Sequence, residues 1–386
     1  MDGMAAIYLD NNSTTRVDPE VVEAMAPYWR EVYANASSQH IMGQAARGAV
    51  EAAREQVAAL IGAKPREIVF TSGGTESDNL AIRGVLDANP NKRHVVTTAV
   101  EHVAVLSLCS RLEQQGYRVT FVAVDSSGRL DTDAFASALD KDAALASVMH
   151  ANNETGVVFP IAEIAEIAAS RGVPLHCDIV QSAGKIDVDV RSMGVRLASL
   201  SAHKMHGPKG VGALYVGSGV RVRNQQVGGH QERDLRPGTE GVASIVGFGR
   251  AAELARKRVV ENGRSIAELR DRLERGIVEA VTIARVNGDT GRRVSNTTNI
   301  GFEGLEAEAI LIALSEAGVC VASGSACSSG SVEPSHVLAA MGIDERIANG
   351  SIRFSLSHET TDDEIERAVE IVKRTALRLS ALAVPR

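Results

Sequence analysis

The chain has 386 residues, of which 44% are hydrophobic and 23% charged, and its formal net charge is −7. These values are ordinary for a globular protein of two or three domains, and they exclude a general nucleic-acid binder that relies on a basic face. We expect no membrane span and no secretion signal, and four widely spaced cysteines predict a reducing cytoplasmic location rather than a disulfide framework.

Between about residues 65 and 216, short β-branched runs alternate with helical patterns. The predicted strands span residues 67–72, 94–99, 118–124, 145–151, 173–178, 197–202 and 212–216. This alternation predicts an α/β fold with a seven-stranded, mostly parallel sheet and helices on both faces. A glycine-bearing connection joins the last two strands, which allows one of them to run antiparallel.

From about residue 250 the pattern changes. A long charged helix is predicted over about 248–280, followed by strand-like segments at 292–302, 318–323 and 351–356 and a final helix from about 361. We interpret this part as a smaller α+β domain. The predicted division is a large domain over 16–249 and a small domain made of 1–15 and 250–386.

Polar residues follow several predicted strands, and ligands of parallel α/β sheets bind beyond the carboxyl ends of their strands. Gly74 and Thr75 open a helix whose N–H groups can bind a phosphate, although a plain strand–helix turn has the same appearance. His102 stands at the start of the next helix, where a histidine is more often structural than catalytic. Asn152 and Asn153 are either turn residues or ligand contacts.

Two further strand ends carry charged residues. Asp178 ends an apolar strand, where a carboxylate needs either a cationic ring nitrogen as partner or a role as a helix cap. Lys204 follows another apolar strand, where burial disfavours the ammonium form and suits Schiff-base chemistry, although a lone lysine more often extends to water. His203 and His206 lack further ligands nearby, so we predict no metal site.

Cys327 lies within SGSACSSGS, residues 323–331, in a loop predicted over about 323–332. Five serines, two glycines and an alanine surround the thiol, and such residues offer little for a cysteine to pack against. Either the thiol is incidental in a surface loop or it must move. Together, the strand ends supply what pyridoxal 5′-phosphate needs: a lysine for its aldehyde, an aspartate for its ring nitrogen and N–H groups for its phosphate.

The chain resembles the NifS/IscS-type (group I) cysteine desulfurases of the class V aminotransferase family over about residues 7–375. The resemblance rests on YLDNNSTT, EIVFTSGGTESDNLAI, VEHVAVL, ANNETGV, AHKMHGPKGVGALYV, GGHQERDLRPGTE, SGSACSSGS and SIRFSLS. It implies fold-type I architecture, bound pyridoxal 5′-phosphate, a homodimer, and conversion of L-cysteine to L-alanine with a persulfide left on the enzyme.

The resemblance also implies residue roles. Lys204 would be the Schiff-base lysine and base, His102 would stack on the ring and move protons, and Cys327 would take the substrate sulfur. A loop of small residues would let this thiol serve both the substrate and an acceptor protein.

The remaining implied contacts concern the cofactor and the substrate. Gly74 and Asn153 would lie at the cofactor, Asp178 would pair with its ring nitrogen and Gln181 with its phenolic oxygen. The phosphate would be held by Thr75, Ser201, His203 and, from the partner subunit, Thr239. Asn35, Asn153 and Arg353 would bind the substrate, and the Arg353 guanidinium would make two parallel hydrogen bonds to the substrate carboxylate.

Several alternatives stay open. The acceptor could serve Fe–S cluster assembly, tRNA thiolation or, as in DndA-type members, DNA sulfur modification, with no direct nucleic-acid contact by this chain. Another class V activity, such as an aminotransferase or a selenocysteine lyase, would not need Cys327, and a non-catalytic sulfur-acceptor platform would not need Lys204. The chain departs from the family at NASS, residues 35–38, where Asn-Pro-Ser is common, and in a short C-terminal tail, which puts docking to a scaffold in doubt.

Overall fold

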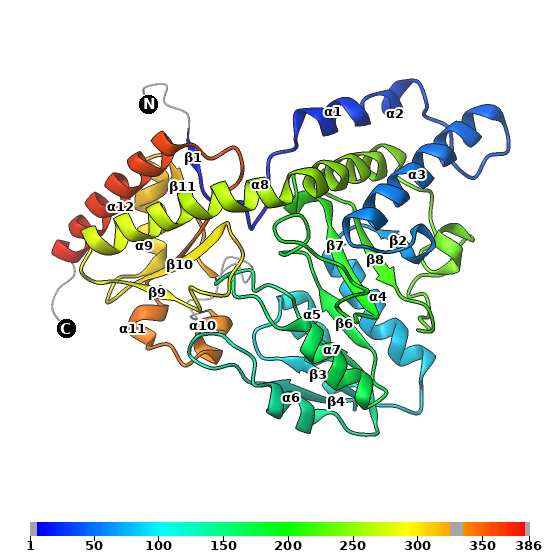
Figure 1. Ribbon diagram of the computed structural model, residues 1–386, viewed down its shortest axis with the longest axis horizontal. Coiled ribbons are helices and arrows are strands. Elements are labelled where there is room, and N and C mark those ends of the chain that lie inside the picture. The colour runs from blue at the N-terminus through cyan, green and yellow to red at the C-terminus, as the bar shows by residue number, and fades with distance from the viewer. Residues whose placement is uncertain (1–5, 325–334, 383–386) are drawn as a thin grey trace.

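The structure, a computed structural model, describes residues 6–324 and 335–382. Its larger part contains a seven-stranded sheet in the order β2-β8-β7-β6-β5-β3-β4 (Figure 1). The strands are β2 Ile68–Thr71, β3 His94–Thr98, β4 Arg118–Val122, β5 Ala143–Ser147, β6 Leu175–Asp178, β7 Leu197–Ser201 and β8 Gly212–Val216. β8 runs antiparallel to both of its neighbours and the other pairs are parallel, so the predicted mostly parallel sheet is confirmed.

Helices cover both faces of this sheet. The helices of both parts of the molecule are α1 Pro19–Met25, α2 Pro27–Arg30, α3 Ile41–Leu60, α4 Gly74–Ala88, α5 Val103–Gln114, α6 Thr132–Ala138, α7 Ile161–Ser170, α8 Val242–Ala280, α9 Ala307–Glu316, α10 His336–Ala340, α11 Glu345–Ala348 and α12 Asp362–Leu382. In the described part of the chain, none of them is both long and apolar enough to cross a membrane.

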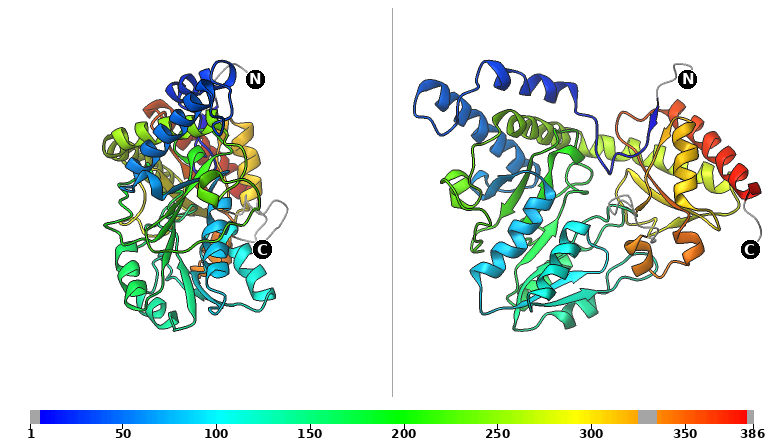
Figure 2. Two further views of the ribbon diagram at one scale, coloured as in Figure 1. Left: turned by 90° about the vertical axis from the view of Figure 1, so that its right-hand side faces the viewer. Right: turned by 180° about the vertical axis from the view of Figure 1, so that it is seen from behind.

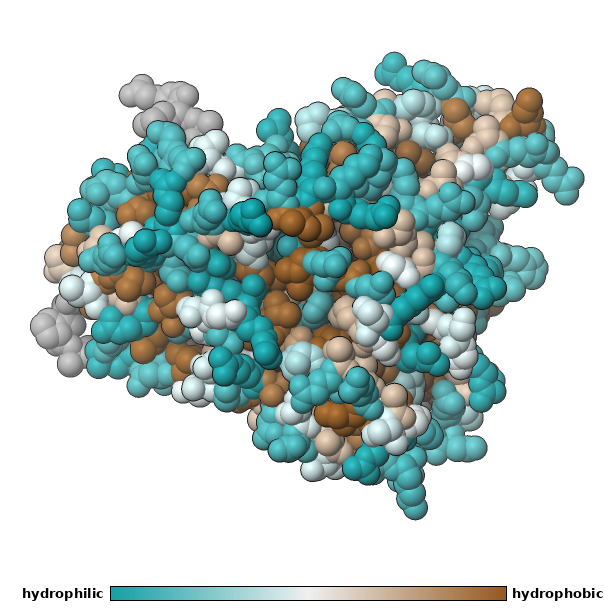
Figure 3. All heavy atoms as spheres, viewed as in Figure 1, coloured by the Kyte–Doolittle hydropathy of each residue, from teal (hydrophilic) through white to brown (hydrophobic). Residues whose placement is uncertain are grey.

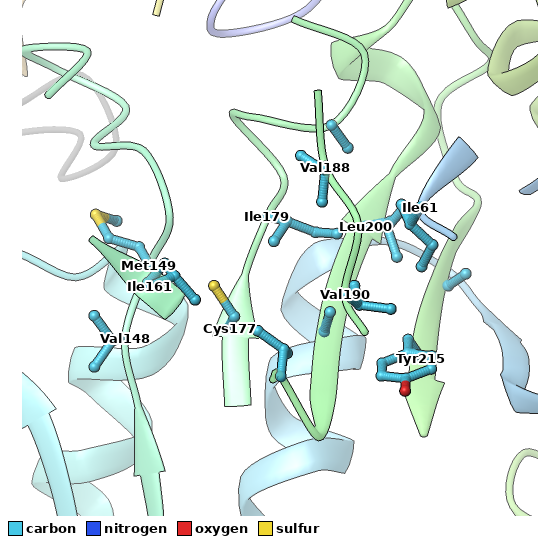
Figure 4. Close-up of a cluster of buried hydrophobic side chains, with 14 of the residues drawn as sticks. Ile61, Val148, Met149, Ile161, Cys177, Ile179, Val188, Val190, Leu200 and Tyr215 are labelled. Atoms are coloured by element: carbon cyan, nitrogen blue, oxygen red, sulfur yellow. The ribbon is translucent and has the colours of Figure 1, made fainter. Parts of the chain in front are cut away.

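Two hydrophobic clusters hold the helices against the large sheet. Side chains of α4 and α5 pack on one face, and side chains of α3, α6, α7 and the first part of α8 pack on the other. Figure 4 shows part of the second cluster, where Cys177 of β6 and Leu200 of β7 gather with Ile61 and Val190. β3, β5, β6 and β7 are buried along their whole length, as expected of parallel strands that helices cover on both faces.

A smaller part of the molecule has its own core. The strands β9 Ala284–Asn287, β10 Thr297–Phe302 and β12 Ser351–Ser355 form an antiparallel sheet, and β1 Ile7–Tyr8 pairs in parallel with β11 Val319–Cys320. A separate hydrophobic cluster joins these strands to α9, α12 and the second part of α8. The 39-residue helix α8 runs along both parts (Figures 1 and 2) and is continuous through residues 249 and 250, so the domain boundary there stays a prediction.

A buried ion pair fixes the segment that follows β8. Arg54 on α3 makes two hydrogen bonds to the Glu232 carboxylate, at 2.7 and 2.8 Å, and the backbone N–H of Phe70 on β2 donates to the same carboxylate at 2.8 Å. Residues 232–234 have φ values of +46°, +56° and +67°, a left-handed conformation that is costly for side chains with a Cβ. The ion pair therefore holds a strained turn against the sheet.

We expect Arg54→Met to lower the free energy of unfolding by about 3–5 kcal/mol, because it leaves Glu232 buried without its counter-charge. Urea unfolding followed by circular dichroism measures this change. Arg66→Met, which makes the same substitution at an exposed site, should change stability by no more than about 0.5 kcal/mol. Equal effects of the two substitutions would contradict the importance of the buried pair.

Candidate active site

A cavity of about 210 Å³ lies at the carboxyl ends of the parallel strands. Its walls include nine of the residues that the sequence predicts for the site: Gly74, Thr75, His102, Asn153, Asp178, Gln181, Ser201, His203 and Lys204. They come from the ends of different strands, which explains why residues spread over 130 positions of the chain, from Gly74 to Lys204, meet in one place.

One end of the cavity is suited to an anion. α4 begins at Gly74, and no side chain caps its N-terminus, so its first N–H groups are available to a ligand. Gly212 on β8 permits this arrangement, because a Cβ at that position would lie 2.6 Å from the Cα atom of Gly73. Burial, followed by the charges of Lys204 and Lys209, lowers the pKa of His203 to about 4, so its imidazole is neutral near pH 7.

Lys204 lies in the turn that follows β7. Its Nζ atom donates to the backbone oxygens of Asn12 and Ser13 at 2.6 and 2.8 Å. His102 caps α5 by accepting from the backbone N–H of Ala104 at 3.2 Å, and its ring also lines the cavity. Burial lowers the pKa of His102 although nearby Asp178 opposes the shift.

Asp178 and two carboxyl groups behind it make one side of the cavity acidic. One Asp178 oxygen accepts from the backbone N–H of Val180 at 2.9 Å, and burial raises the pKa of this carboxyl although His102 and Lys204 oppose the shift. Asp78 Oδ1 and Glu101 Oε2 are buried without a hydrogen-bond partner among the residues that the structure covers, and burial raises the pKa of Glu101 to about 8. A protonated pyridine nitrogen fits this side, because it supplies the missing positive charge.

Asn12 and Lys185 complete the site, although sequence reasoning did not predict them. Gln181 Nε2 donates to the backbone oxygen of Asn12 at 3.0 Å, and Lys185 Nζ donates to Gln181 Oε1 at 2.6 Å and to Asn12 Oδ1 at 2.8 Å. Asn12 belongs to the motif YLDNNSTT, which indicated the family but not this contact. Lys185 is the first cation after Asp178 in the chain, a signal too weak to place it at the site.

Arg353 on β12 lies beside the cavity rather than in its walls. Its guanidinium donates to the backbone oxygen of Asn153 at 3.1 Å, to Asp10 Oδ1 at 2.8 Å and to Ser13 Oγ at 2.7 Å. Its Nε atom is buried without a hydrogen-bond partner among the described residues. A substrate carboxylate would therefore have to compete with Asp10 for this side chain.

Two predicted residues lie away from the cavity. Asn35 is exposed in the turn before α3, where its Oδ1 atom accepts from the backbone N–H of Ser37 at 2.8 Å. Thr239 lines a different cavity, together with Arg236 and Ser244. Their roles toward the substrate and a partner subunit stay predictions. Among the residues with described positions, no three His, Cys, Asp or Glu side chains are placed to hold a metal ion.

Cys327 lies outside the described residues, but both flanks of its segment lie near the cavity. Ala322 exchanges backbone hydrogen bonds with Arg353, and Ser335 donates to Glu154 Oε2 at 2.5 Å. Gly324 is so close to the same carboxylate that any side chain there would overlap with it.

Two other cysteines are poor candidates for sulfur chemistry. Burial raises the pKa of Cys109 to about 12 and that of Cys177 well above its ordinary value. Because the thiolate is the reactive form of cysteine, neither side chain is suited to attack a substrate.

Comparison with known proteins gives consistent matches along the chain. The model of the class V aminotransferases matches residues 7–368. A cysteine desulfurase of Nostoc sp. is 52% identical over 380 residues, which cover 98% of this chain and 95% of that protein. A solved NifS-like protein superposes with a TM-score of 0.91 at 37% identity, covering 97% of this chain and all of the other. DndA from Streptomyces lividans superposes with a TM-score of 0.77 at 36% identity, covering 91% and 99% of the two chains.

We expect Gly212→Ala to weaken binding of pyridoxal 5′-phosphate to the cofactor-free protein by about tenfold, or ~1.4 kcal/mol, because the added methyl displaces Gly73 and the N–H groups after it. Equilibrium dialysis measures the affinity. Gly48→Ala on α3 is the matched control, since a methyl there meets no atom within 4 Å. Unchanged affinity of the Gly212 variant would contradict the proposed anion site.

Proposed function

The chain belongs to the class V aminotransferase family, and from this premise we propose that it is a pyridoxal-phosphate-dependent cysteine desulfurase. It converts L-cysteine to L-alanine and retains the sulfur as a persulfide. The main support is the convergence of nine predicted cofactor and catalytic residues on one cavity that offers an amine, an anion site and a buried carboxylate.

Pyridoxal 5′-phosphate supplies an aldehyde that reacts with amines and a ring that draws electrons from the substrate Cα atom. In this proposal Lys204 binds the aldehyde and Asp178 holds the proton of the ring nitrogen. Gln181 donates to the phenolic oxygen. The phosphate lies at the first turn of α4, where Gly74 and Thr75 present backbone N–H groups and Ser201 and His203 stand opposite.

Lys204 and His102 move the protons. A lysine can act as a base only as the neutral amine. The backbone oxygens of Asn12 and Ser13 hold the Lys204 amine at the edge of the cavity, from which it can reach the Cα proton of a bound substrate. His102, whose pKa is lowered mainly by burial, offers a neutral imidazole that can accept a proton and return it.

Asn153 and Arg353 orient the substrate. Asn153 lines the cavity, and its backbone oxygen accepts from the guanidinium of Arg353. Arg353 presents the planar fork that binds a carboxylate in two places, and release of Asp10 would free it for that purpose.

Cys327 takes the sulfur. Its thiolate attacks the sulfur of the substrate, an S–S bond forms and the C–S bond breaks, with its electron pair passing to the substrate Cβ atom. That carbon takes up a proton and becomes the methyl group of alanine. The segment that contains Cys327 begins beside Arg353 and ends beside Glu154, and both positions adjoin the cavity.

The persulfide sulfur then passes to an acceptor protein. The identity of this acceptor decides whether the enzyme serves Fe–S cluster assembly, tRNA thiolation or DNA phosphorothioation, since the chemistry within the cavity is the same for each. We place the reaction in the cytoplasm, where reducing conditions keep a thiol available for the next cycle.

A homodimer completes the proposal. Large apolar side chains are exposed around α1, α2 and the start of α3, namely Val22, Trp29, Tyr33 and Ile41, with exposed fractions of 53–82%. Part of this region is visible at the upper right of Figure 3. Exposed apolar groups of this kind are typical of a subunit interface. Thr239 does not line the cofactor cavity of its own chain. This position supports a contact between Thr239 and the phosphate of the cofactor in the partner subunit.

Lys204→Ala should abolish covalent attachment of the cofactor, because it removes the amine that binds the aldehyde. Borohydride reduction followed by peptide mass spectrometry should find the cofactor on the Lys204 peptide of the wild type and on no peptide of the variant. Lys209→Ala, an exposed lysine five residues away, should keep the attachment. A trapped adduct on another lysine of the wild type would contradict the assignment.

Cys327→Ser should keep the visible band of the bound cofactor and lower alanine formation from cysteine by about 10³-fold or more, since a hydroxyl cannot accept the sulfur. Cys320→Ser on β11 is the control and should retain the wild-type rate. Normal turnover by the Cys327 variant would show that this thiol is only a surface residue and would favour another class V activity.

A further inference from the structure

Lys185, Gln181 and Asn12 form a polar cluster at the wall of the cofactor cavity. Lys185 lies in the turn after β6, and its Nζ atom donates to Gln181 Oε1 at 2.6 Å and to Asn12 Oδ1 at 2.8 Å. The proposed roles of Lys204, Asp178 and Cys327 make no use of Lys185. The question is what this lysine does there.

The cluster fixes which end of the Gln181 amide is oxygen and which is nitrogen. The lysine nitrogen donates to one end, so that end is the oxygen. The backbone oxygen of Asn12, which can only accept, lies 3.0 Å from the other end, so that end is the NH₂ group. Gln181 is only 6% exposed and lines the cavity, so the second N–H of this group is left for a ligand there.

We propose that Lys185 is a positioning residue that holds the Gln181 amide with its NH₂ group toward the phenolic oxygen of the cofactor. This inference rests on the proposed function, in which Gln181 donates to that oxygen. Without Lys185 the Oε1 end of the amide loses its donor, and the side chain is held only by the bond from Nε2 to the backbone oxygen of Asn12. The amide can then rotate about that one contact, and its second N–H no longer points steadily at the phenolic oxygen.

The protonation state of Lys185 does not alter this argument. Burial, followed by the charges of Lys204 and Arg353, lowers the pKa of Lys185 well below its ordinary value. Both the ammonium and the neutral amine carry N–H groups, and either can donate to Gln181 and Asn12. Asn12 also keeps a second donor to Oδ1, from Asn296 Nδ2 at 3.0 Å, so loss of Lys185 leaves Asn12 held.

The test is the pH at which the visible absorption band of the bound cofactor changes. A hydrogen bond from Gln181 stabilises negative charge on the phenolic oxygen of the cofactor. The proton on the neighbouring nitrogen, which Lys204 contributes, then becomes easier to lose. Lys185→Met should therefore raise the midpoint of this titration by about one pH unit. The other titratable groups that face the cavity are the same in every variant compared, namely Asp78, His102, Asp178, His203 and Lys204.

A double-mutant cycle separates this inference from the proposed function. Gln181→Ala should raise the midpoint as much as Lys185→Met, and the double variant should show no further rise, because both substitutions remove one hydrogen bond. Additive shifts, or a shift with Gln181→Ala but none with Lys185→Met, would overturn the role of Lys185. No shift with Gln181→Ala would instead refute the assignment of Gln181 to the phenolic oxygen.

Two further variants serve as controls, one for the loss of any lysine and one for a variant that fails to fold. Lys141→Met removes an exposed lysine far along the chain and should leave the midpoint unchanged. If Lys185→Met does not fold, Lys185→Ser takes its place, since it leaves a polar gap that water can fill and should give the same upward shift. Circular dichroism establishes that each variant is folded, and a Lys185→Ser protein with the wild-type midpoint would overturn the inference.

Discussion

Asn12 is only 1% exposed and uses every hydrogen-bonding group that it has. Its Nδ2 atom donates to Asn153 and Thr297, its Oδ1 atom accepts from Lys185 and Asn296, and its backbone N–H donates to Ser355. Its backbone oxygen accepts from Lys204 and Gln181. These partners come from the segments that follow strands of the large sheet and from β10, its preceding residue and β12 in the small one, so one asparagine links the two parts of the molecule. A buried polar residue with this many partners is costly to disturb, since each lost bond leaves a group unsatisfied.

The charges around the cavity are arranged as two opposed groups. Asp78, Asp178 and Glu101 lie on one side, where burial raises their pKa values. Lys185, Lys204 and Arg353 lie on the side of the N-terminal segment and β12. The charges of Lys204 and Arg353 add to the effect of burial in lowering the pKa of Lys185, and Lys204 also lowers that of His102. A ligand with a cationic ring nitrogen at one end and an anionic oxygen near the other matches this arrangement, because each end would face groups of the opposite charge type. The match explains why so many titratable side chains can lie together beneath the surface.

The sheet and most of the cavity could be predicted from the sequence because their signals are local. Each buried strand is a short apolar run, and each residue that follows it must lie at the same edge of a parallel sheet, as Asp178 and Lys204 do. The contacts of Asn12 and Lys185 could not be predicted in this way. Asn12 meets Lys204 from 192 positions away in the chain. Only the packing of the N-terminal segment between the two cores brings them together, and no periodicity records that packing.

Arg353 shows a second limit of the sequence signal. The resemblance implies that its guanidinium binds the substrate carboxylate, but not that Asp10 and Ser13 already contact this group. The segment 325–334, which contains Cys327, starts next to this arginine through Ala322 and returns at Ser335 and His336, which bond to Glu154 and to the backbone of Glu101. The first flank belongs to the small sheet, whereas α10, which follows the second, packs into the core of the large one. The two flanks of this segment therefore adjoin different parts of the molecule, and Asn12 links the same two parts through its contacts with Asn153 and Ser355.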